Sequence, residues 1–282
     1  MKKMMIMLAV LLLTACEKAV LPDKQGNVTM TFSVTQSDRP TRGTVTIGDY
    51  FTKLNVMLFD ADGAKVFDKV RTQLATDDDF GTLSAALQAG TYTVVAVGHS
   101  SAVSATIKSP QMVQFTAKDG QKLTDTFCYC GTVTVGDTPE QYDLVMNRVG
   151  AMVQFRLTDV TIPDTFSKMV ITYTGGSANF NPSTFDGITK SNQSETRTRS
   201  SVYQVYTFPY MATSCTLKMT LTADAADGTT LRTRTFDGVP VTRNRITTYT
   251  GQFFDGTEGT FTQTAFGFSV NGDWEGENHF TF

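Results

Sequence analysis

The chain is poor in the residues that most enzymes use for chemistry. Its 282 residues include only two histidines, His99 and His279, which are far apart and lack the spacing of metal ligands. Neither a nucleophile elbow, nor a phosphate-binding loop, nor a dinucleotide-binding glycine pattern occurs. We therefore expect no enzymatic activity and no cofactor.

Long runs of one charge are also missing, and the formal net charge is −3. This balance argues against a nucleic-acid partner and against a polybasic membrane patch. Residues 60–63 (Asp-Ala-Asp-Gly) lack the later acidic ligands and the closing glutamate of a calcium loop, so we interpret them as a hairpin turn. Three aspartates at 77–79 are interpreted as a solvated loop.

Cysteine is scarce, and the three beyond Cys16 form an odd number, which excludes a complete disulfide framework. On a strand, Cys128 and Cys130 would have Cα atoms ~6.6 Å apart, at the edge of disulfide geometry. We expect free thiols, with a structural bridge as the alternative. Cys215 is expected to begin a strand and to point into a core. The single tryptophan, Trp274, is interpreted as a packing anchor rather than a carbohydrate platform.

Sustained helical periodicity is missing too, and the best short helical candidate covers residues 83–87. Alternation with period two recurs instead, for example over residues 28–34, 151–157 and 215–221. Threonine is the commonest residue, and 20 Phe and 9 Tyr are spread along the chain, a composition typical of half-buried strands. Many short strands separated by Asp-Gly turns predict an all-β sandwich or barrel, with an exposed loop over residues 187–201.

The first sixteen residues are typical of an export signal. Two lysines precede an apolar run over residues 4–13, which is shorter than the ~20 residues that span a bilayer. The ending Leu-Thr-Ala-Cys looks like a bacterial lipobox, so we expect cleavage between Ala15 and Cys16 and lipidation of the Cys16 thiol. Two or more acyl chains would hold the protein firmly in a membrane. The alternative is an ordinary signal peptide with a chance cysteine.

The remaining length predicts two domains, since domains are usually about 100–150 residues long. With residues 1–15 as signal and 16–26 as a polar tether, we place the N-terminal domain at 27–147 and the C-terminal domain at 148–282. Residues 87–92 (Leu-Gln-Ala-Gly-Thr-Tyr) precede a strand at 93–97 that is apolar on both faces. This pattern resembles transthyretin-like sandwich domains of exported proteins.

Several segments together resemble the FimB-type fimbrial anchor subunits of type V pili, which occur in Gram-negative anaerobes of the Bacteroidia class. Besides the lipobox, the segments that carry the resemblance are residues 54–63, 87–98, 147–151 and 242–251. The resemblance implies two tandem transthyretin-like β-sandwich domains and a lipid-anchored, surface-exposed position in the outer membrane. It also implies a place at the fimbrial base, where the protein tethers the filament and limits its length.

The resemblance further implies contact with fimbrial stalk subunits by strand complementation. A sandwich that lacks an edge strand exposes backbone groups that another chain can pair with. The candidate donor or acceptor strands carry Val28, Met30, Phe32 and Val34 near the front, and Phe266, Phe268 and Val270 near the end. Residues 280–282 are a further candidate. The alternative for each strand is pairing only within its own fold.

A possible protease site lies at Arg42-Gly43, because related stalk subunits lose an N-terminal strand to an arginine-specific protease. Cleavage after Arg42 would release Cys16 together with strand 28–34 and leave a stalk or tip adhesin. We favour the uncleaved anchor, because the chain is compact and the motifs lie close together. A third reading is a glycan-binding surface lipoprotein, which the single tryptophan makes weaker.

Overall fold

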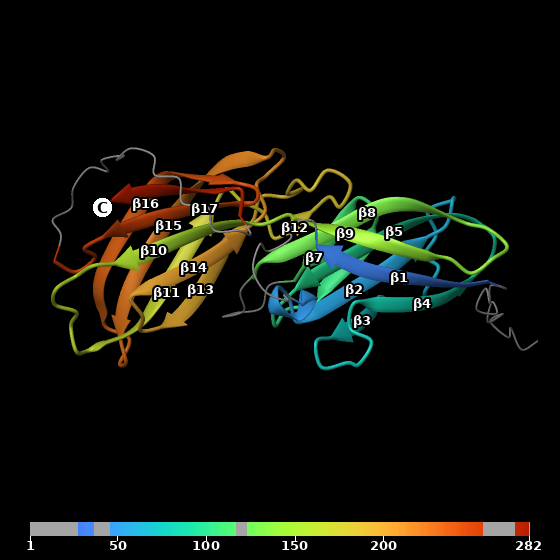
Figure 1. The fold of residues 1–282 in the computed structure, drawn as a ribbon. Coiled ribbons are helices and arrows are strands. Elements are labelled where there is room, and N and C mark those ends of the chain that lie inside the picture. The colour runs from blue at the N-terminus through green and yellow to red at the C-terminus, as the bar shows by residue number, and fades with distance from the viewer. Residues whose placement is uncertain (1–27, 37–45, 117–122, 256–273, 282) are drawn as a thin grey trace, which may run out of the picture.

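The fold is almost entirely β. The computed structural model describes residues 28–36, 46–116, 123–255 and 274–281. Within these ranges there is one 3-10 turn, η1 (Ile47–Asp49), and no α-helix. The predicted all-β class is therefore confirmed. Strands β1–β9 occupy one half of an elongated molecule, and most of the later strands occupy the other half (Figure 1).

The first half contains one large sheet and a β-hairpin. Its strands are β1 (Val28–Gln36), β2 (Lys53–Phe59), β3 (Arg71–Leu74), β4 (Thr82–Leu87), β5 (Gly90–His99), β6 (Ala105–Ser109), β7 (Met112–Phe115), β8 (Thr126–Val135) and β9 (Gln141–Arg148). The large sheet has the order β3-β2-β5-β8-β9-β1-β4. Because β8 and β9 pair at only two positions, the strands β9, β1 and β4 can cover β2, β5 and β8 and enclose a core between them.

The second half is a sandwich of two four-stranded sheets. Its strands are β10 (Ala151–Leu157), β11 (Phe166–Thr174), β12 (Asn179–Phe180), β13 (Gln193–Thr198), β14 (Val202–Thr207), β15 (Ser214–Ala225), β16 (Thr230–Thr242), β17 (Arg245–Gly251) and β18 (Gly276–Thr281). One sheet has the order β14-β10-β17-β18 and the other β13-β11-β15-β16. The apolar faces of both sheets enclose a single core. Cys215, expected in a core, lies half-buried at the rim of this one.

Strand β2, residues 94–99 of β5 and residues 126–128 of β8 are buried on both faces. Along β5, Val94 and Ala96 face the core under β1, whereas Val95 and Val97 face a third core on the opposite side. This arrangement confirms the prediction that residues 93–97 are apolar on both faces. It follows the rule that strands covered on both sides lose the alternation of apolar and polar residues.

The third core also joins the two halves. Strand β12 pairs with β7, and Phe180 and Phe208 from the second half are buried among residues of β5, β6 and β7. The rings of Phe115 and Phe208 lie 5.8 Å apart. Burying each such phenylalanine contributes about 1.5–3 kcal/mol, so an apolar contact, and not only the chain connection, links the halves. The domain limits at residues 147 and 148 remain a prediction.

Two of the segments singled out in the sequence meet at this junction. Asn244 has a left-handed backbone (φ 57°) in the turn between β16 and β17. Its backbone N–H donates to the Gly150 carbonyl at 2.9 Å, and its side-chain oxygen accepts a hydrogen bond from the Arg148 guanidinium at 3.1 Å. Arg148 also pairs with Asp125 at 2.9 Å and lies 4.1 Å from the ring centroid of Trp274. The tryptophan therefore packs as an anchor.

Two local expectations were wrong. Residues 83–87 form strand β4 and not a helix, because pairing with β1 and burial of alternate side chains outweigh local propensity. Residues 187–201 are not simply an exposed loop, because they contain β13. Glu195 in β13 is 2% exposed and accepts a hydrogen bond from Tyr173. A buried carboxylate gives no apolar alternation, so the pattern did not indicate this strand.

His99 is a buried core residue at the end of β5. The Ser101 amide donates to its Nδ1 at 3.1 Å, and the Asn55 amide nitrogen lies 2.9 Å from its Nε2. The Ser101 N–H needs Nδ1 as an acceptor, so an imidazolium, which carries a proton on each nitrogen, would lose this hydrogen bond. Burial, together with the charge of Lys53, lowers the pKa of His99 to about 4.

We predict that His99 destabilises the fold in acid. Because the folded pKa lies below the value of 6.5 expected when unfolded, the unfolded chain binds the extra proton first. The free energy of unfolding should fall by up to about 3 kcal/mol between pH 6.5 and pH 4 from this group. Urea unfolding of wild type and His99→Gln across this range checks it, with His279→Gln as the control. Parallel pH curves for wild type and His99→Gln would contradict the prediction.

We also predict that Arg148 stabilises the junction. Its side chain is 2% exposed, so Arg148→Ala leaves Asp125 without its buried partner and should cost about 2–4 kcal/mol. The matched control is Lys218→Ala, which breaks an exposed 3.2 Å pair with Asp237 and should cost at most about 0.5 kcal/mol. Thermal unfolding of both variants measures the difference, and equal losses would refute the proposed role.

Candidate subunit interface: the edge strands and the groove between β3 and β4

Strand β4 is an edge strand whose outer side is unprotected beyond its first residue, Thr82. It pairs with β1 over Thr82–Leu87 and has no other neighbour in its sheet. Its sequence, Thr-Leu-Ser-Ala-Ala-Leu, contains neither a charge nor a proline. Natural sheet edges usually carry charges, prolines or bulges that prevent further pairing. The outer edge of β4 can therefore accept another strand.

The other edge strands longer than two residues are protected in the part of the chain that the structure describes. Each of β3, β6, β13, β16 and β18 contains at least one charged residue. Strand β16 also has a bulge at Asp237 and Gly238. Strand β14 is uncharged, but its carbonyls at Gln204 and Tyr206 accept hydrogen bonds from Arg197 and Tyr173.

A groove of about 880 Å³ lies between β4 and the opposite edge strand, β3. It is lined by residues of β4 and by the segment that leads into β3: Val66, Phe67, Asp68, Lys69, Val70, Arg71, Thr72, Leu83, Ser84, Ala85 and Ala86. Val66, Phe67 and Leu83 are half-buried at the rim of the core under β1. The groove is thus an opening in the side of the first sandwich, with an apolar floor.

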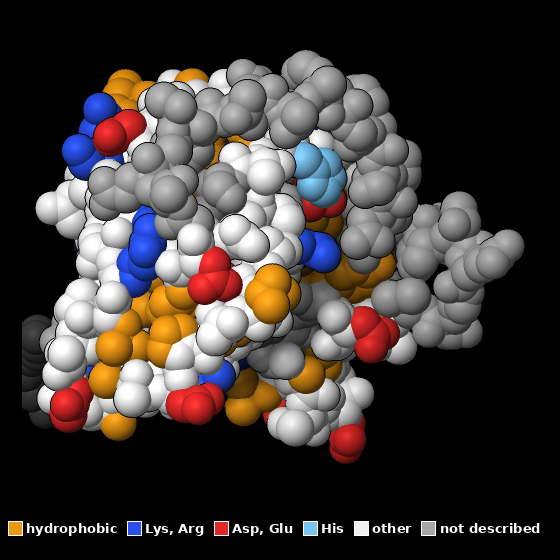
Figure 2. All heavy atoms as spheres, turned by 90° about the vertical axis from the view of Figure 1, so that its left-hand side faces the viewer, with side chains coloured by type: hydrophobic (Ala, Val, Ile, Leu, Met, Phe, Trp, Pro, Cys, Tyr) orange, Lys and Arg blue, Asp and Glu red, His pale blue; other side chains and the backbone are white. Residues whose placement is uncertain are grey.

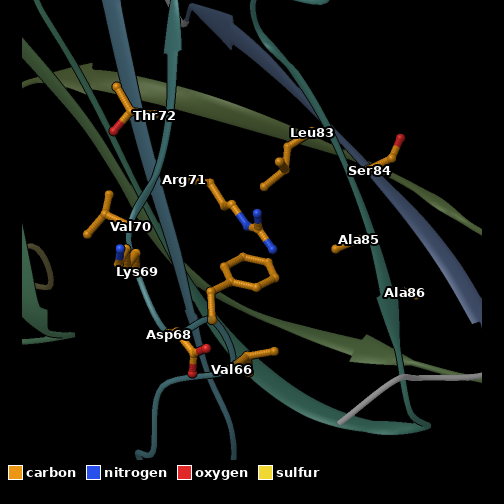
Figure 3. Close-up of a pocket in the computed structure, with 11 residues that line it drawn as sticks. Val66, Asp68, Lys69, Val70, Arg71, Thr72, Leu83, Ser84, Ala85 and Ala86 are labelled. Carbon is orange, nitrogen blue, oxygen red and sulfur yellow. The ribbon is translucent and has the colours of Figure 1, made fainter. Parts of the chain in front are cut away.

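Arg71 is the cation at the centre of this groove. Figure 3 shows its side chain pointing from β3 into the space beside Leu83 and Ala85. Its guanidinium carbon lies 4.9 Å from the ring centroid of Phe67. No carboxylate among the described residues forms an ion pair with Arg71 or with Lys69.

Gln73 closes one end of the groove. It is 8% exposed, and its amide donates to the carbonyls of Thr82 at 2.7 Å and Asp79 at 3.1 Å. Its side-chain oxygen accepts from the Gly81 amide at 3.2 Å. No sequence pattern indicated this bridge, because an isolated glutamine on a short strand is normally exposed.

The front candidate strand, β1, lies inside its sheet. It pairs with β4 on one side and, in parallel, with β9 on the other. The side chains of Val28, Met30, Phe32 and Val34 all face the core and are 0–8% exposed. In this structure β1 thus pairs within its own chain.

Strand β18 is the edge strand closest to the end of the chain, and it pairs in parallel with β17. Phe280 stacks on Tyr249 with 4.6 Å between ring centroids, and Glu277 accepts a hydrogen bond from Thr248. His279 lies 3.5 Å from Glu277 at this edge. Seen from this end of the molecule, side chains of both charge signs and apolar side chains are interspersed (Figure 2).

The remaining candidates have structural roles. Asp60 accepts from the amides of Asp62 and Ala64, which confirms the turn predicted at residues 60–63. Cys128, Cys130 and Cys215 are free, and burial raises the pKa of the Cys128 thiol. In the described ranges no cluster of three or more His, Cys, Asp or Glu side chains could hold a metal ion. No helix there has the length and apolarity to span a bilayer.

Several predicted residues lie outside the part that the structure describes. They are Ala15, Cys16, Arg42, Gly43, Phe266, Phe268 and Val270. Their predicted roles in cleavage, lipidation and strand exchange therefore stay predictions.

Comparison with known proteins identifies the family. The model of the fimbrillin-A-associated anchor proteins Mfa1 and Mfa2 matches residues 15–280. A candidate adhesin from Bacteroides ovatus has a similar structure, with a TM-score of 0.51 and 12% identity over 80% of this chain and 87% of that one. The fimbrial anchor protein Mfa2 from Porphyromonas gingivalis gives a TM-score of 0.43 and 13% identity over 75% of this chain and 83% of that one.

A fimbrial assembly protein from Parabacteroides distasonis gives a TM-score of 0.46 and 13% identity over 79% of this chain and 90% of that one. No curated protein matches the sequence. The family match covers almost the whole chain, and it confirms the resemblance to fimbrial anchor subunits. Fimbrial association implies a place at the cell surface. The chain belongs to the family of fimbrillin-A-associated anchor proteins, whose members serve as fimbrial accessory subunits.

Proposed function

We propose that this protein is the lipid-anchored base subunit of a fimbria and joins the filament to the outer membrane. The observation that carries the proposal is the family match over residues 15–280, which begins directly before the lipobox cysteine. Lipidation of Cys16 would provide the membrane attachment, and the tether at 16–26 would separate the lipid from the folded part. The fold contributes interaction surfaces rather than a reactive centre.

The position of β1 supports an anchor that stays uncleaved. Cleavage after Arg42 would remove a strand with four core-facing side chains that pairs with both β4 and β9. The loss would open an apolar slot that only another strand could fill, as in the stalk subunits of the resemblance. An anchor that keeps Cys16 must also keep β1, because β1 lies between the lipid and the protease site.

The end of the chain is the region we propose for strand exchange with the adjoining subunit. Strand β18 has a neighbour on one side only, and most of its residues are half-buried or exposed. The upstream residues Phe266, Phe268 and Val270 alternate in the manner of a strand. An edge strand with few buried contacts opens at a lower free-energy cost than a core strand.

The lipid anchor has a direct test. In Cys16→Ala the thiol that would carry the acyl chains is missing, so the protein should move from the membrane fraction to the soluble fraction. Cys130→Ala is the matched control and should stay with the membrane, since Cys130 is a free cysteine within the fold. Immunoblotting of fractionated cells gives the distribution. A Cys16→Ala protein that remained in the membrane fraction would rule out this anchor.

The role at the base has a separate test. Electron microscopy of cells that lack the gene should show long filaments shed into the medium, because filament growth continues without attachment. Missing filaments would indicate a stalk or initiating subunit instead, and unchanged filaments would point to the glycan-binding alternative. N-terminal sequencing of the surface form separates anchor from stalk, because a start at Gly43 excludes a retained lipid.

A further inference from the structure

We propose that the groove between β3 and β4 binds an extended, acidic segment of the adjoining fimbrial subunit, which adds a strand to the free edge of β4. The inference rests on the proposed function for the identity of the partner. It differs from exchange of β1 or β18, because both of those strands stay in place.

The backbone of β4 determines the kind of occupant. From Leu83 to Leu87 its outer N–H and C=O groups have no partner among the described residues, since β4 pairs only with β1. A row of unpaired backbone groups on a strand is satisfied most fully by another extended chain. Small side chains at Ser84, Ala85 and Ala86 leave room for a close approach.

The walls of the groove determine the side chains of the occupant. Val66, Phe67 and Leu83 form a half-buried apolar floor, which favours apolar side chains at alternate positions of the added strand. The wall on the β3 side carries two cations, Arg71 and Lys69, and one carboxylate, Asp68. Neither cation has an ion-pair partner among the described residues. A carboxylate on the added strand would complement Arg71.

Gln73 limits the length of the occupant. Its amide already occupies the carbonyls of Thr82 and Asp79, so the added strand can pair only with the outer groups of β4 beyond Thr82. Pairing along residues 83–87 gives a short ladder. Such a short contact would add to a main attachment made by another part of the protein. It would hold the first filament subunit in a fixed orientation.

Edge variants test this contact against purified fimbriae from the same cells. Ser84→Lys with Ala86→Lys places two charges on the exposed face of β4, and we expect binding at least about tenfold weaker, equivalent to about 1.4 kcal/mol. Ser194→Lys on the protected edge strand β13 is the matched control and should bind like wild type. Arg71→Gln should weaken binding and reduce its dependence on salt, because a cation is lost.

A second measurement detects the proximity of the partner to β4 and does not rely on a loss of binding. A photoreactive benzoylphenylalanine at Ala86 should crosslink to a fimbrial subunit, and the same group at Ser194 should not. Mass spectrometry of the crosslinked peptide should find an extended segment with a carboxylate. Crosslinks at both positions, at neither, or only to a second copy of this chain would overturn the inference.

The outcomes also separate this inference from the proposed function. If wild-type protein fails to bind the fimbriae, the proposed function itself is contradicted. If wild type binds and the double-lysine variant binds equally well, the groove is not the contact and the anchor role stands. Selective loss in the β4 and Arg71 variants supports the groove.

Discussion

The structure depends on the burial of β2, β5 and the start of β8 on both faces. One face packs under β1, β4 and β9, and the other packs against β6, β7 and two phenylalanines from the second half of the chain. Because protein interiors are close-packed, side chains on the two faces fix the positions of everything that covers them. The first sandwich and the link between the halves therefore share the same three strands.

This constraint also explains where the molecule can interact. The central strands are paired on both sides, so a partner can add a strand only at the edges of the sheets. Most edges carry charges, a bulge or hydrogen bonds from neighbouring side chains, and such features block further pairing. Beyond Thr82, whose carbonyl accepts a hydrogen bond from Gln73, the outer side of β4 lacks them, and the groove beside it contains a cation at Arg71. The shape of the sandwich thus limits the candidate contact surfaces to a few.

The junction around Asn244 gives the two halves a polar connection beside their apolar one. Its hydrogen bonds to Gly150 and Arg148 join the turn between β16 and β17 to the start of β10. The Glu275 amide donates to the Asn244 carbonyl, so the segment that leads into β18 meets the same point. Such a connection would resist bending between the halves.

The sequence by itself determined the all-β class, the two-faced strand at residues 93–97, the turn at residues 60–63 and the family. These features are local, because alternation, turn residues and short motifs reflect contacts that each segment makes in any sandwich. Tertiary structure decided the features that depend on distant partners. Residues 83–87 became an edge strand because β1 pairs with them, and Glu195 was buried because Tyr173 and Arg197 satisfy its carboxylate. The groove could not be predicted either, because β3 and β4, although consecutive in the sequence, face each other only because β3 pairs with β2 and β4 pairs with β1.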